Sequence, residues 1–293
     1  MKQILMIINP RAGRSKPFEP LLQAMSLLSG HGWNLRVRLT AASGDATRIA
    51  REEGDGCDVC IAVGGDGTLN EVAAGLLELE HPPLLGYFPQ GSTNDFAATL
   101  KIPGDPPAAA WAILNGEERR MDVGSWNGRS FLYVASFGAF TRSSYTAPQS
   151  VKNALGHAAY ILEGVKDIET LRPYRVKITA DGEVLDGEYL FGAVCNSTSI
   201  GGMMKLGSGD VVLDDGKFEL LLIPNPKSPA EFQRTALALL EQKYDGEGLV
   251  FRHVSHIEMT TEENLPWSLD GEYAPGCSAV TVENHPGKLR MLL

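Results

Sequence analysis

The first part of the chain alternates short apolar runs with stretches in which apolar residues recur at helical spacing. Short apolar runs predict buried strands, and the longer periodic stretches predict amphipathic helices. Their regular alternation predicts an α/β domain, with a mostly parallel sheet and helices on both faces. The predicted strands are residues 3–8, 33–39, 58–63 and 84–88, and the predicted helices are 18–28, 46–53, 68–80 and 106–115.

The pattern changes in the second part of the chain. Asn127-Gly128 and Asp181-Gly182 each separate two strand-like runs, which is typical of two-residue β-hairpin turns. Helical spacing returns only at 150–171 and 229–244. We therefore expect a mainly antiparallel β-sandwich or distorted barrel. Its predicted strands are 119–126, 129–137, 174–180, 183–196, 217–223, 249–259, 267–269, 277–283 and 288–293.

The change of pattern places a domain boundary near residues 121–124. We expect residues 1–122 to form the α/β domain and residues 123–293 to form the β domain, and it stays open whether the last strands return to the first domain. No linker, repeat or low-complexity tract separates the two parts. We therefore expect the two domains to abut and to form a cleft.

A glycine-rich turn, Gly64-Gly65-Asp66-Gly67, joins the third strand to the following helix. Glycines let a ligand approach the backbone, and the free N–H groups of a first helical turn attract anions, so the turn predicts a phosphate site. Thr68 and Glu71 have capping-box spacing, which predicts that the helix starts at Thr68. The Asp66 carboxylate repels phosphate unless a cation such as magnesium lies between them. The alternative is a tight turn with an acid that complements the helix dipole.

Three other turns are predicted at the same edge of the sheet, because ligands of open parallel sheets bind outside the carboxyl ends of the strands. They are residues 9–13, the loop that starts at Thr40, and residues 91–95. Their small, polar and glycine residues suit phosphate and ribose contacts, although such turns favour the same residue types for structural reasons. The shared edge favours a nucleotide site.

Acidic residues at three later positions are candidates for chemistry. Asp122 lies where the chain leaves the first domain. It has either a magnesium-binding or active-site role, or it is simply an exposed acid at the end of a strand. Glu272 follows an Asp-Gly turn signal, as a general base for a substrate hydroxyl or as a solvated turn residue. Asp214 and Asp215 precede a glycine, where they form a plain turn or hold a metal ion with neighbouring carbonyls.

Composition and charge narrow the function classes. The chain has 293 residues, 43% of them hydrophobic, which is enough for one large or two medium cores. A net charge of −10 argues against nucleic-acid binding, which needs a basic surface. Because no apolar run reaches membrane-helix length and the start of the chain is typical of a strand rather than a signal peptide, we expect a cytoplasmic protein with peripheral membrane contact at most. Cys57 and Cys60 lead into a strand, so we expect ordinary buried thiols rather than a redox or zinc site.

Taken in order, these motifs resemble those of the bacterial soluble diacylglycerol-kinase-like lipid kinases, relatives of sphingosine and ceramide kinases. The resemblance covers nearly the whole chain. The Gly-Gly-Asp-Gly-Thr run is shared with NAD kinases, whereas Asn94-Asp95-Phe96-Ala97 and Asp270-Gly271-Glu272 point to lipid kinases. The matching segments are 9–13, Thr40, 64–71, 89–97, 121–124, 214–217 and 269–272.

The resemblance implies an α/β nucleotide domain and a β-sandwich lipid domain, with the active site in the interdomain cleft. It implies that Asp66 and Asp122 organise the catalytic Mg²⁺ and that Glu272 accepts the proton. It also implies a structural magnesium held by Asp215 with the main-chain carbonyls of Val212 and Lys217. Relatives usually carry Thr where this chain has Ser92, and the hydroxyl is retained. The implied ATP contacts are Asn9, Pro10, Arg11, Ala12, Gly13, Thr40, Gly64, Gly65, Asp66, Gly67, Thr68, Leu69, Asn70 and Ser92.

The activity implied by the resemblance is ATP-dependent phosphorylation of a lipid hydroxyl, with diacylglycerol converted to phosphatidic acid. Phosphatidylglycerol, a sphingoid base or NAD stays open as the substrate, as does a non-catalytic nucleotide- or lipid-binding protein. The implied partners are ATP and a lipid with a free hydroxyl, met by peripheral contact at the inner face of the membrane. Nucleic acid is not expected, and a homodimer is left open.

Overall fold

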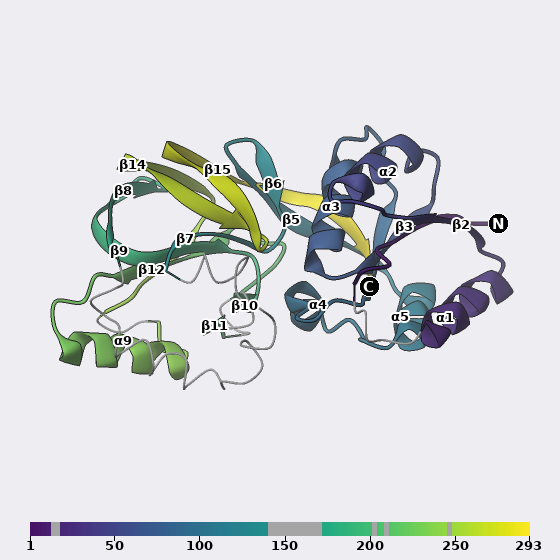
Figure 1. Cartoon of the computed structure of the whole chain (residues 1–293), viewed down its shortest axis with the longest axis horizontal. Coiled ribbons are helices and arrows are strands. Elements are labelled where there is room, and N and C mark those ends of the chain that lie inside the picture. Colours follow the sequence, from purple (N-terminus) through teal and green to yellow (C-terminus); the bar gives the residue numbers. More distant parts are fainter. Residues whose placement is uncertain (13–17, 140–171, 201–203, 208–210, 245–247) are drawn as a thin grey trace. The chain divides into compact units, whose positions relative to one another are not determined.

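The computed structural model describes residues 1–12, 18–139, 172–200, 204–207, 211–244 and 248–293. These residues form two compact units (Figure 1). Unit 1 contains Met1–Val123 and Pro286–Leu293, and unit 2 contains Gly124–His285. The predicted helix at 150–171 lies outside the described residues. Across the described ranges, no helix has both the length and the apolar character needed to span a bilayer.

Unit 1 is built on a parallel sheet in the order β2-β1-β3-β4. The end of β15 adds a further parallel strand, with Met291 beside Leu85. Strands β1 and β3 are almost continuously apolar and buried, as strands covered on both faces require. The strand bounds are β1 (Gln3–Ile8), β2 (Asn34–Leu39), β3 (Val59–Gly64), β4 (Leu84–Pro89) and β15 (Glu272–Leu292).

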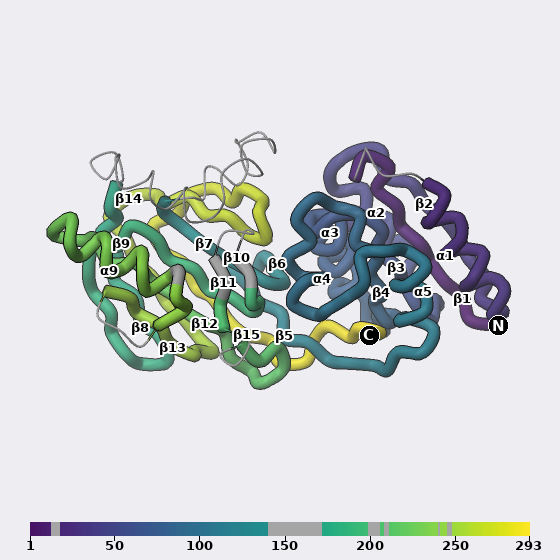
Figure 2. The backbone as a smooth tube through the Cα atoms, turned by 90° about the horizontal axis from the view of Figure 1, so that it is seen from below, coloured from purple at the N-terminus to yellow at the C-terminus, as the bar shows by residue number. Residues whose placement is uncertain are grey.

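Helices cover both faces of this sheet (Figures 1 and 2). On one face, α1 (Glu19–Gly30) and α5 (Pro106–Asn115) pack together and share a core with alternate residues of β1 and β3. On the other face, α2 (Asp45–Glu53) packs against α3 (Asp66–Leu77). There Gly75 lies so close to Thr47 and Ala50 that a Cβ at this position would overlap both. The short helix α4 (Asp95–Leu100) follows β4. The α/β prediction is confirmed.

The start of α3 differs from the prediction. The helix begins at Asp66, so Thr68 lies inside its first turn and the predicted capping box is wrong. Glu71 caps the neighbouring helix instead: its carboxylate accepts hydrogen bonds from the backbone N–H groups of Gly44 (2.9 Å) and Ala46 (3.2 Å) at the start of α2. Because Gly44 has no side chain with which to cap α2, a carboxylate from α3 fills that role.

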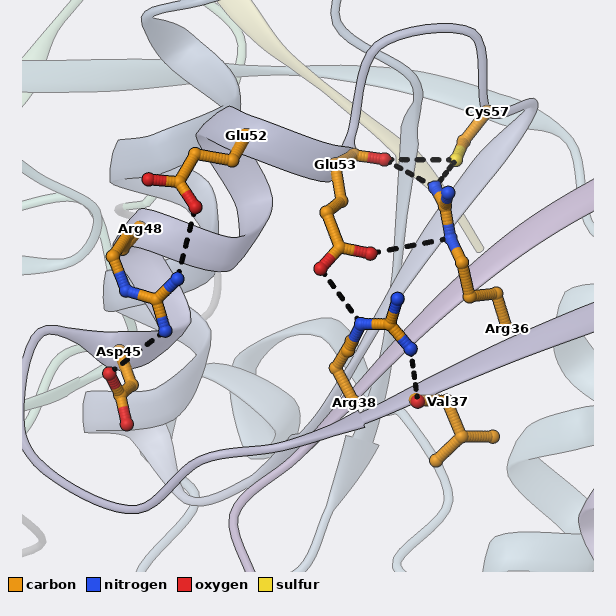
Figure 3. A network of polar contacts seen from close by, with 8 residues as sticks. All are labelled: Arg36, Val37, Arg38, Asp45, Arg48, Glu52, Glu53 and Cys57. Atoms are coloured by element: carbon orange, nitrogen blue, oxygen red, sulfur yellow. Dashed lines mark hydrogen bonds and ion pairs between the residues drawn. The ribbon is translucent and has the colours of Figure 1, made fainter.

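Cys57 lies in a charged network on the surface of unit 1 (Figure 3). The Arg36 guanidinium donates to its Sγ over 3.2 Å, and the Glu53 carboxylate forms ion pairs with Arg36 (3.6 Å) and Arg38 (2.8 Å). Cys60 lies inside β3, where burial raises the pKa of its thiol. Both cysteines are free; Cys60 is buried as predicted, whereas Cys57 is only partly buried.

Unit 2 is an antiparallel β structure with the strand path β13-β12-β9-β7-β14-β15. Strand β8 pairs with both β9 and β14, and these two strands also pair with β7, so the sheet folds back on itself around an apolar core. The bounds are β5 (Glu118–Trp126), β6 (Arg129–Phe131), β7 (Val134–Gly138), β8 (Tyr174–Ala180), β9 (Glu183–Cys195), β10 (Ser199–Ile200), β11 (Met204–Lys205), β12 (Phe218–Pro224), α9 (Pro229–Leu240), β13 (Val250–Val254) and β14 (His256–Leu269).

The β prediction for the second part of the chain is confirmed, with three corrections to its strands. The predicted strand 129–137 is divided into β6 and β7. The predicted strand 249–259 is divided into β13 and β14, and β14 also contains the predicted strand 267–269. The predicted strands 277–283 and 288–293 belong to one long strand, β15. Both predicted hairpin turns have positive φ at each central residue, Asn127-Gly128 and Asp181-Gly182, as a two-residue hairpin requires.

Candidate active site

The turns that follow the strands of unit 1 are joined into one edge by hydrogen bonds. The side-chain amide of Asn9 donates to Oγ1 of Thr68 (3.1 Å), which links the turn after β1 to the start of α3. The N–H of Gln90 donates to the carbonyl of Gly64 (2.6 Å), which links the turns after β3 and β4. The N–H of Thr40 donates to the carbonyl of Ile8 (3.0 Å) and extends the row to β2.

Two glycines at this edge are required by close backbone approach. A Cβ on Gly65 would lie 3.1 Å from the Cα of Gly91, and a Cβ on Gly91 would overlap the Cα of Gly65. A Cβ on Gly64 would overlap the side chain of Thr68. The turns after β3 and β4 therefore pack backbone against backbone, and the hydroxyl of Tyr87 joins them by donating to the carbonyl of Gly64 over 3.3 Å.

The first turn of α3 has the features of a helix terminus that can bind an anion. Gly65 is its N-cap and has no side chain to accept the first N–H groups, which therefore remain available at the edge. Thr68 and Asn70 are both buried here, and Oδ1 of Asn70 has no hydrogen-bond partner within the described ranges. Leu69 is fully buried in the core, so its side chain packs inside the unit and only its backbone is near the turn.

Asp66 lies between two helix starts. Its carboxylate accepts hydrogen bonds from the backbone N–H groups of Asp95 (3.0 Å) and Phe96 (3.2 Å) in the first turn of α4. Burial and the nearby Asp95 carboxylate raise the pKa of Asp66 to about 6, although these N–H bonds act in the opposite direction. Two neighbouring carboxylates in a buried setting repel each other, and a bound cation relieves that repulsion.

Asp122 is held by a different part of unit 1. It is 2% exposed in β5, and its Oδ1 accepts a hydrogen bond from the N–H of Gly287 in β15 (2.8 Å). This hydrogen bond links β5 to β15 within unit 1. The alternative of an exposed strand-end acid is therefore wrong for Asp122.

The other residues predicted to contact the nucleotide lie along the same edge, and their side chains differ in solvent exposure. Asn9 accepts the N–H of Arg11 through Oδ1 (2.9 Å), which fixes the turn after β1. Pro10 and Arg11 are exposed, and Ser92 is exposed in the turn after β4. Gly13 lies outside the described residues.

The two acids of the Asp270-Gly271-Glu272 turn in unit 2 lie in different environments. Asp270 is 3% exposed, and its carboxylate accepts three consecutive backbone N–H groups: Leu132 (2.7 Å), Tyr133 (3.0 Å) and Val134 (3.0 Å). These bonds take the N–H groups between β6 and β7 out of the strand ladder, which explains why one predicted strand is divided. Asp270 is a structural anchor.

Glu272, by contrast, is the acid that this turn presents to solvent. It is the first residue of β15 and pairs with Leu269 across the turn. One carboxylate oxygen, Oε2, forms an ion pair with Nη2 of Arg129 over 3.0 Å, and the two side chains are 38% and 42% exposed. An accessible carboxylate of this kind can accept a proton from a substrate hydroxyl.

The turn that contains Asp215 precedes β12. Oδ1 of Asp215 accepts the N–H of Lys217 (2.9 Å), and Gly216 has a positive φ of 78°. Asp214 and Val212 are both exposed. The turn thus presents the carboxylates of Asp214 and Asp215 to solvent.

Both predicted magnesium positions can be tested against these oxygen ligands. In the described part of the chain, no three or more His, Cys, Asp or Glu side chains form a metal-binding group. Magnesium bound by proteins usually takes one or two carboxylates and completes its shell with water and substrate phosphates. The predicted catalytic position joined Asp66 to Asp122, whereas the carboxylate that raises the pKa of Asp66 is that of Asp95. The Asp66–Asp95 pair fits this pattern at the edge predicted to bind nucleotide, and the Asp215 turn fits it with exposed carboxylates.

Three residues at these sites have contacts that the sequence did not predict. Asp95 was expected within the turn 91–95 without a role of its own, yet its carboxylate lies near that of Asp66. Asp270 was expected as a plain turn residue. Arg129 received no role. Only Asp95 had a signal in the sequence, because it is an acid in a turn predicted at the nucleotide edge, whereas the contacts of Asp270 and Arg129 join segments about 140 residues apart.

Comparisons with known proteins agree with this arrangement. Residues 3–126 match the family model of the diacylglycerol kinase catalytic domain, and residues 134–293 match that of the YegS C-terminal NAD kinase beta sandwich-like domain. A protein of Bacillus subtilis (strain 168) named diacylglycerol kinase is 37% identical over 276 residues, covering 93% of this chain and 90% of that protein. A diacylglycerol kinase of Staphylococcus aureus (strain bovine RF122 / ET3-1) is 32% identical, covering 93% of this chain and 86% of that protein.

Solved structures are similar over almost the full length. A crystal structure from Bacillus anthracis str. Sterne aligns with a TM-score of 0.84 at 27% identity, covering 99% of this chain and 95% of that chain. A crystal structure described as a diacylglycerol kinase from the same organism aligns with a TM-score of 0.76 at 25% identity, covering 99% of this chain and 96% of that chain.

Proposed function

Because this chain belongs to the diacylglycerol kinase family and is a lipid kinase, we propose that it transfers the γ-phosphoryl group of ATP to the hydroxyl of diacylglycerol. The product is phosphatidic acid. The observation that carries the proposal is the Asp66–Asp95 carboxylate pair beside the glycine turn and the open start of α3. A buried acid pair at an anion-binding helix terminus is suited to a metal–phosphate complex and would otherwise repel phosphate.

In this proposal, the edge of unit 1 binds the nucleotide. The N–H groups at the start of α3 donate hydrogen bonds to the phosphate oxygens, and Gly65 and Gly91 leave the backbone open to them. Asn9, Thr40 and the hydroxyl of Ser92 contribute polar contacts along the same row. Asp66 and Asp122 hold magnesium, which supplies charge neutralisation at the phosphates when it is bound.

Glu272 is the proposed general base. The lipid hydroxyl oxygen forms a bond to the γ-phosphorus while the bond from that phosphorus to the β–γ bridging oxygen breaks, so ADP leaves. The hydroxyl proton passes to the Glu272 carboxylate. Positioning of the two reactants supplies most of the rate enhancement in this class of reaction, and the base adds to it.

The experiment that tests the proposal uses purified protein with labelled ATP and magnesium. Diacylglycerol, phosphatidylglycerol and a sphingoid base are offered separately in mixed micelles, and NAD is offered in solution. We expect label in phosphatidic acid at the highest rate. A higher rate with another lipid would overturn the proposed substrate, and label in NAD alone would overturn the proposed substrate class.

Two further roles belong to the same proposal. Asp215, with the carbonyls of Val212 and Lys217, holds a structural magnesium, since its turn offers oxygen ligands at the surface of unit 2. The protein meets its lipid by peripheral contact with the inner face of the membrane. Co-sedimentation with vesicles that contain diacylglycerol tests this contact, and absence of the protein from the vesicle pellet would contradict it.

A further inference from the structure

Arg129 and Glu272 meet at two tight turns of unit 2. Each is the first residue after a two-residue hairpin turn: Arg129 pairs with Trp126 across one turn, and Glu272 pairs with Leu269 across the other. The Nη2 atom of Arg129 donates to Oε2 of Glu272 over 3.0 Å, and its Nη1 atom donates to the carbonyl of Tyr273 over 3.4 Å. The guanidinium therefore contacts both the side chain of Glu272 and the backbone directly after it.

The Arg129 turn is itself tied down. Asn127 exchanges two bonds with Thr281 of β15: its N–H donates to the Thr281 carbonyl (2.9 Å), and its Oδ1 accepts the Thr281 N–H (2.8 Å). The Asn127 side chain also donates to the carbonyl of Ala279 (3.1 Å). Because this turn is fixed to β15 and the Glu272 turn is anchored by Asp270, the geometry of the ion pair is set by the backbone.

The pair is too exposed to be important for folding. Exposed ion pairs contribute about 0–1 kcal/mol to stability, and Arg129 and Glu272 are 42% and 38% exposed. Unit 2 contains a similar pair, Arg252 and Glu183, which are 45% and 46% exposed and are joined by two hydrogen bonds of 2.8 and 2.9 Å. That pair connects two strands and has no role in the proposed chemistry, so it is a matched control.

We propose that Arg129 is a positioning residue that orients the Glu272 carboxylate and keeps it ionised for proton transfer. The inference rests on the proposed role of Glu272. Arg129 contacts the Glu272 carboxylate, whereas the carboxylate of Asp270, two residues earlier, is bonded to the backbone between β6 and β7. A guanidinium at 3.0 Å favours the charged form of a carboxylate, and its planar fork limits the orientations of the acid.

The test compares Arg129→Met, Arg129→Lys and Arg252→Met in the full chain. Thermal unfolding of all three variants is measured first. For Arg129→Met we expect kcat to fall about fivefold, with the KM for ATP unchanged. We also expect the acidic limb of the kcat/KM profile to move up by about 0.5 pH unit. Arg129→Lys should restore the acidic limb, because it restores the charge, but only part of kcat, because lysine lacks the planar fork. Arg252→Met should match wild type.

The outcomes separate this inference from the proposed function. If Glu272→Gln leaves turnover within a few-fold of wild type, Glu272 is not the base, and the inference is lost with it. If Glu272→Gln is nearly inactive but Arg129→Met keeps both the kcat and the pH profile of wild type, the inference alone is wrong. An equal effect of Arg252→Met would also overturn it, since the loss would then belong to any exposed ion pair of unit 2.

Discussion

The two turns that carry the proposed acids treat their carboxylates in opposite ways. In unit 1, Asp66 is largely buried and close to the carboxylate of Asp95, and its pKa is raised to about 6. In unit 2, Glu272 is accessible and paired with the Arg129 guanidinium. A carboxylate beside another acid gains from a cation, whereas a carboxylate beside arginine already has one. The comparison suggests that the first turn is built to receive a metal ion and the second to receive a proton.

The largest effect on activity is expected from substitution of Asp66, the proposed magnesium ligand. If Asp66 holds the proposed magnesium, Asp66→Ala should reduce phosphoryl transfer by at least about 10³-fold, because the ion that neutralises the phosphates would lose its ligand. The matched control is Asp105→Ala, which removes another helix-capping acid of unit 1, bonded to the N–H of Ala108. Turnover with saturating ATP and magnesium is the measurement, and near-normal turnover of the Asp66 variant would refute its assigned role.

Glu272→Gln tests the proposed general base. It keeps the shape of the side chain but removes the base, which typically costs about 10²–10⁴-fold in rate. Nucleotide affinity by calorimetry should stay constant, because the proposed phosphate contacts belong to unit 1. Glu263→Gln, which breaks the exposed pair with Arg172 (2.7 Å), should leave turnover unchanged. A fall in ATP affinity that matched the fall in turnover would remove the distinction between the two turns.

Asp270→Ala tests whether the Glu272 turn needs its buried anchor. Loss of the carboxylate leaves three buried N–H groups without their acceptor, so we expect the free energy of unfolding to fall by about 3–5 kcal/mol in urea. Asp181→Ala is the control, since Asp181 accepts bonds from Ser255 and His256 at an exposed turn of the same Asp-Gly type. That variant should lose about 1 kcal/mol. Equal losses would contradict the anchor role.

The raised pKa of Asp66 predicts a pH dependence in metal-free protein. The folded pKa is about 6 against an ordinary 3.8, so the folded state holds a proton that the unfolded state releases in this range. The stabilisation is complete below about pH 4 and is lost as the pH rises through about 6. Relative to Asp66→Asn, the wild type should lose roughly 3 kcal/mol of unfolding free energy between pH 4 and pH 7 in EDTA. Parallel urea-unfolding profiles for the two proteins would count against it.

The smallest effect is expected for Asp215 and concerns thermal stability. If Asp215 holds a structural magnesium, saturating magnesium should raise the Tm of the wild type by about 2–6 °C, and this shift should disappear in Asp215→Ala. Asp214→Ala, at the neighbouring exposed position, should keep the shift. An Asp215 variant that melts with the full magnesium shift would leave Asp215 as a turn residue.

Local sequence signals predicted the fold because its elements depend on local chemistry. The alternation of strands and helices in unit 1 and the Asn127-Gly128 and Asp181-Gly182 turns of unit 2 follow from short-range patterns. The Thr68–Glu71 spacing was misinterpreted because Glu71 caps the start of α2, where its partner Gly44 lies 27 residues earlier in the chain. Spacing along one helix cannot reveal a partner on another helix.

The candidate site shows the same division. Glycines and small polar residues at strand ends predicted the position of the edge, because parallel strands bring their carboxyl ends together. The burial and the contacts of each acid could not be predicted from the sequence. Whether an Asp-Gly turn is buried like Asp270 or exposed like Asp181 depends on which backbone lies against it, and that is decided by pairing between distant strands.

The contact between Gly65 and Gly91 divides the edge into fixed and variable parts. Because neither residue can acquire a side chain without separating the two turns, substitution at these positions cannot reshape the phosphate site for altered nucleotides. Ser92 and Thr93 are exposed in the same turn and can change without that penalty. Attempts to engineer a different phosphate donor should therefore begin with libraries at Ser92 and Thr93 and leave both glycines constant.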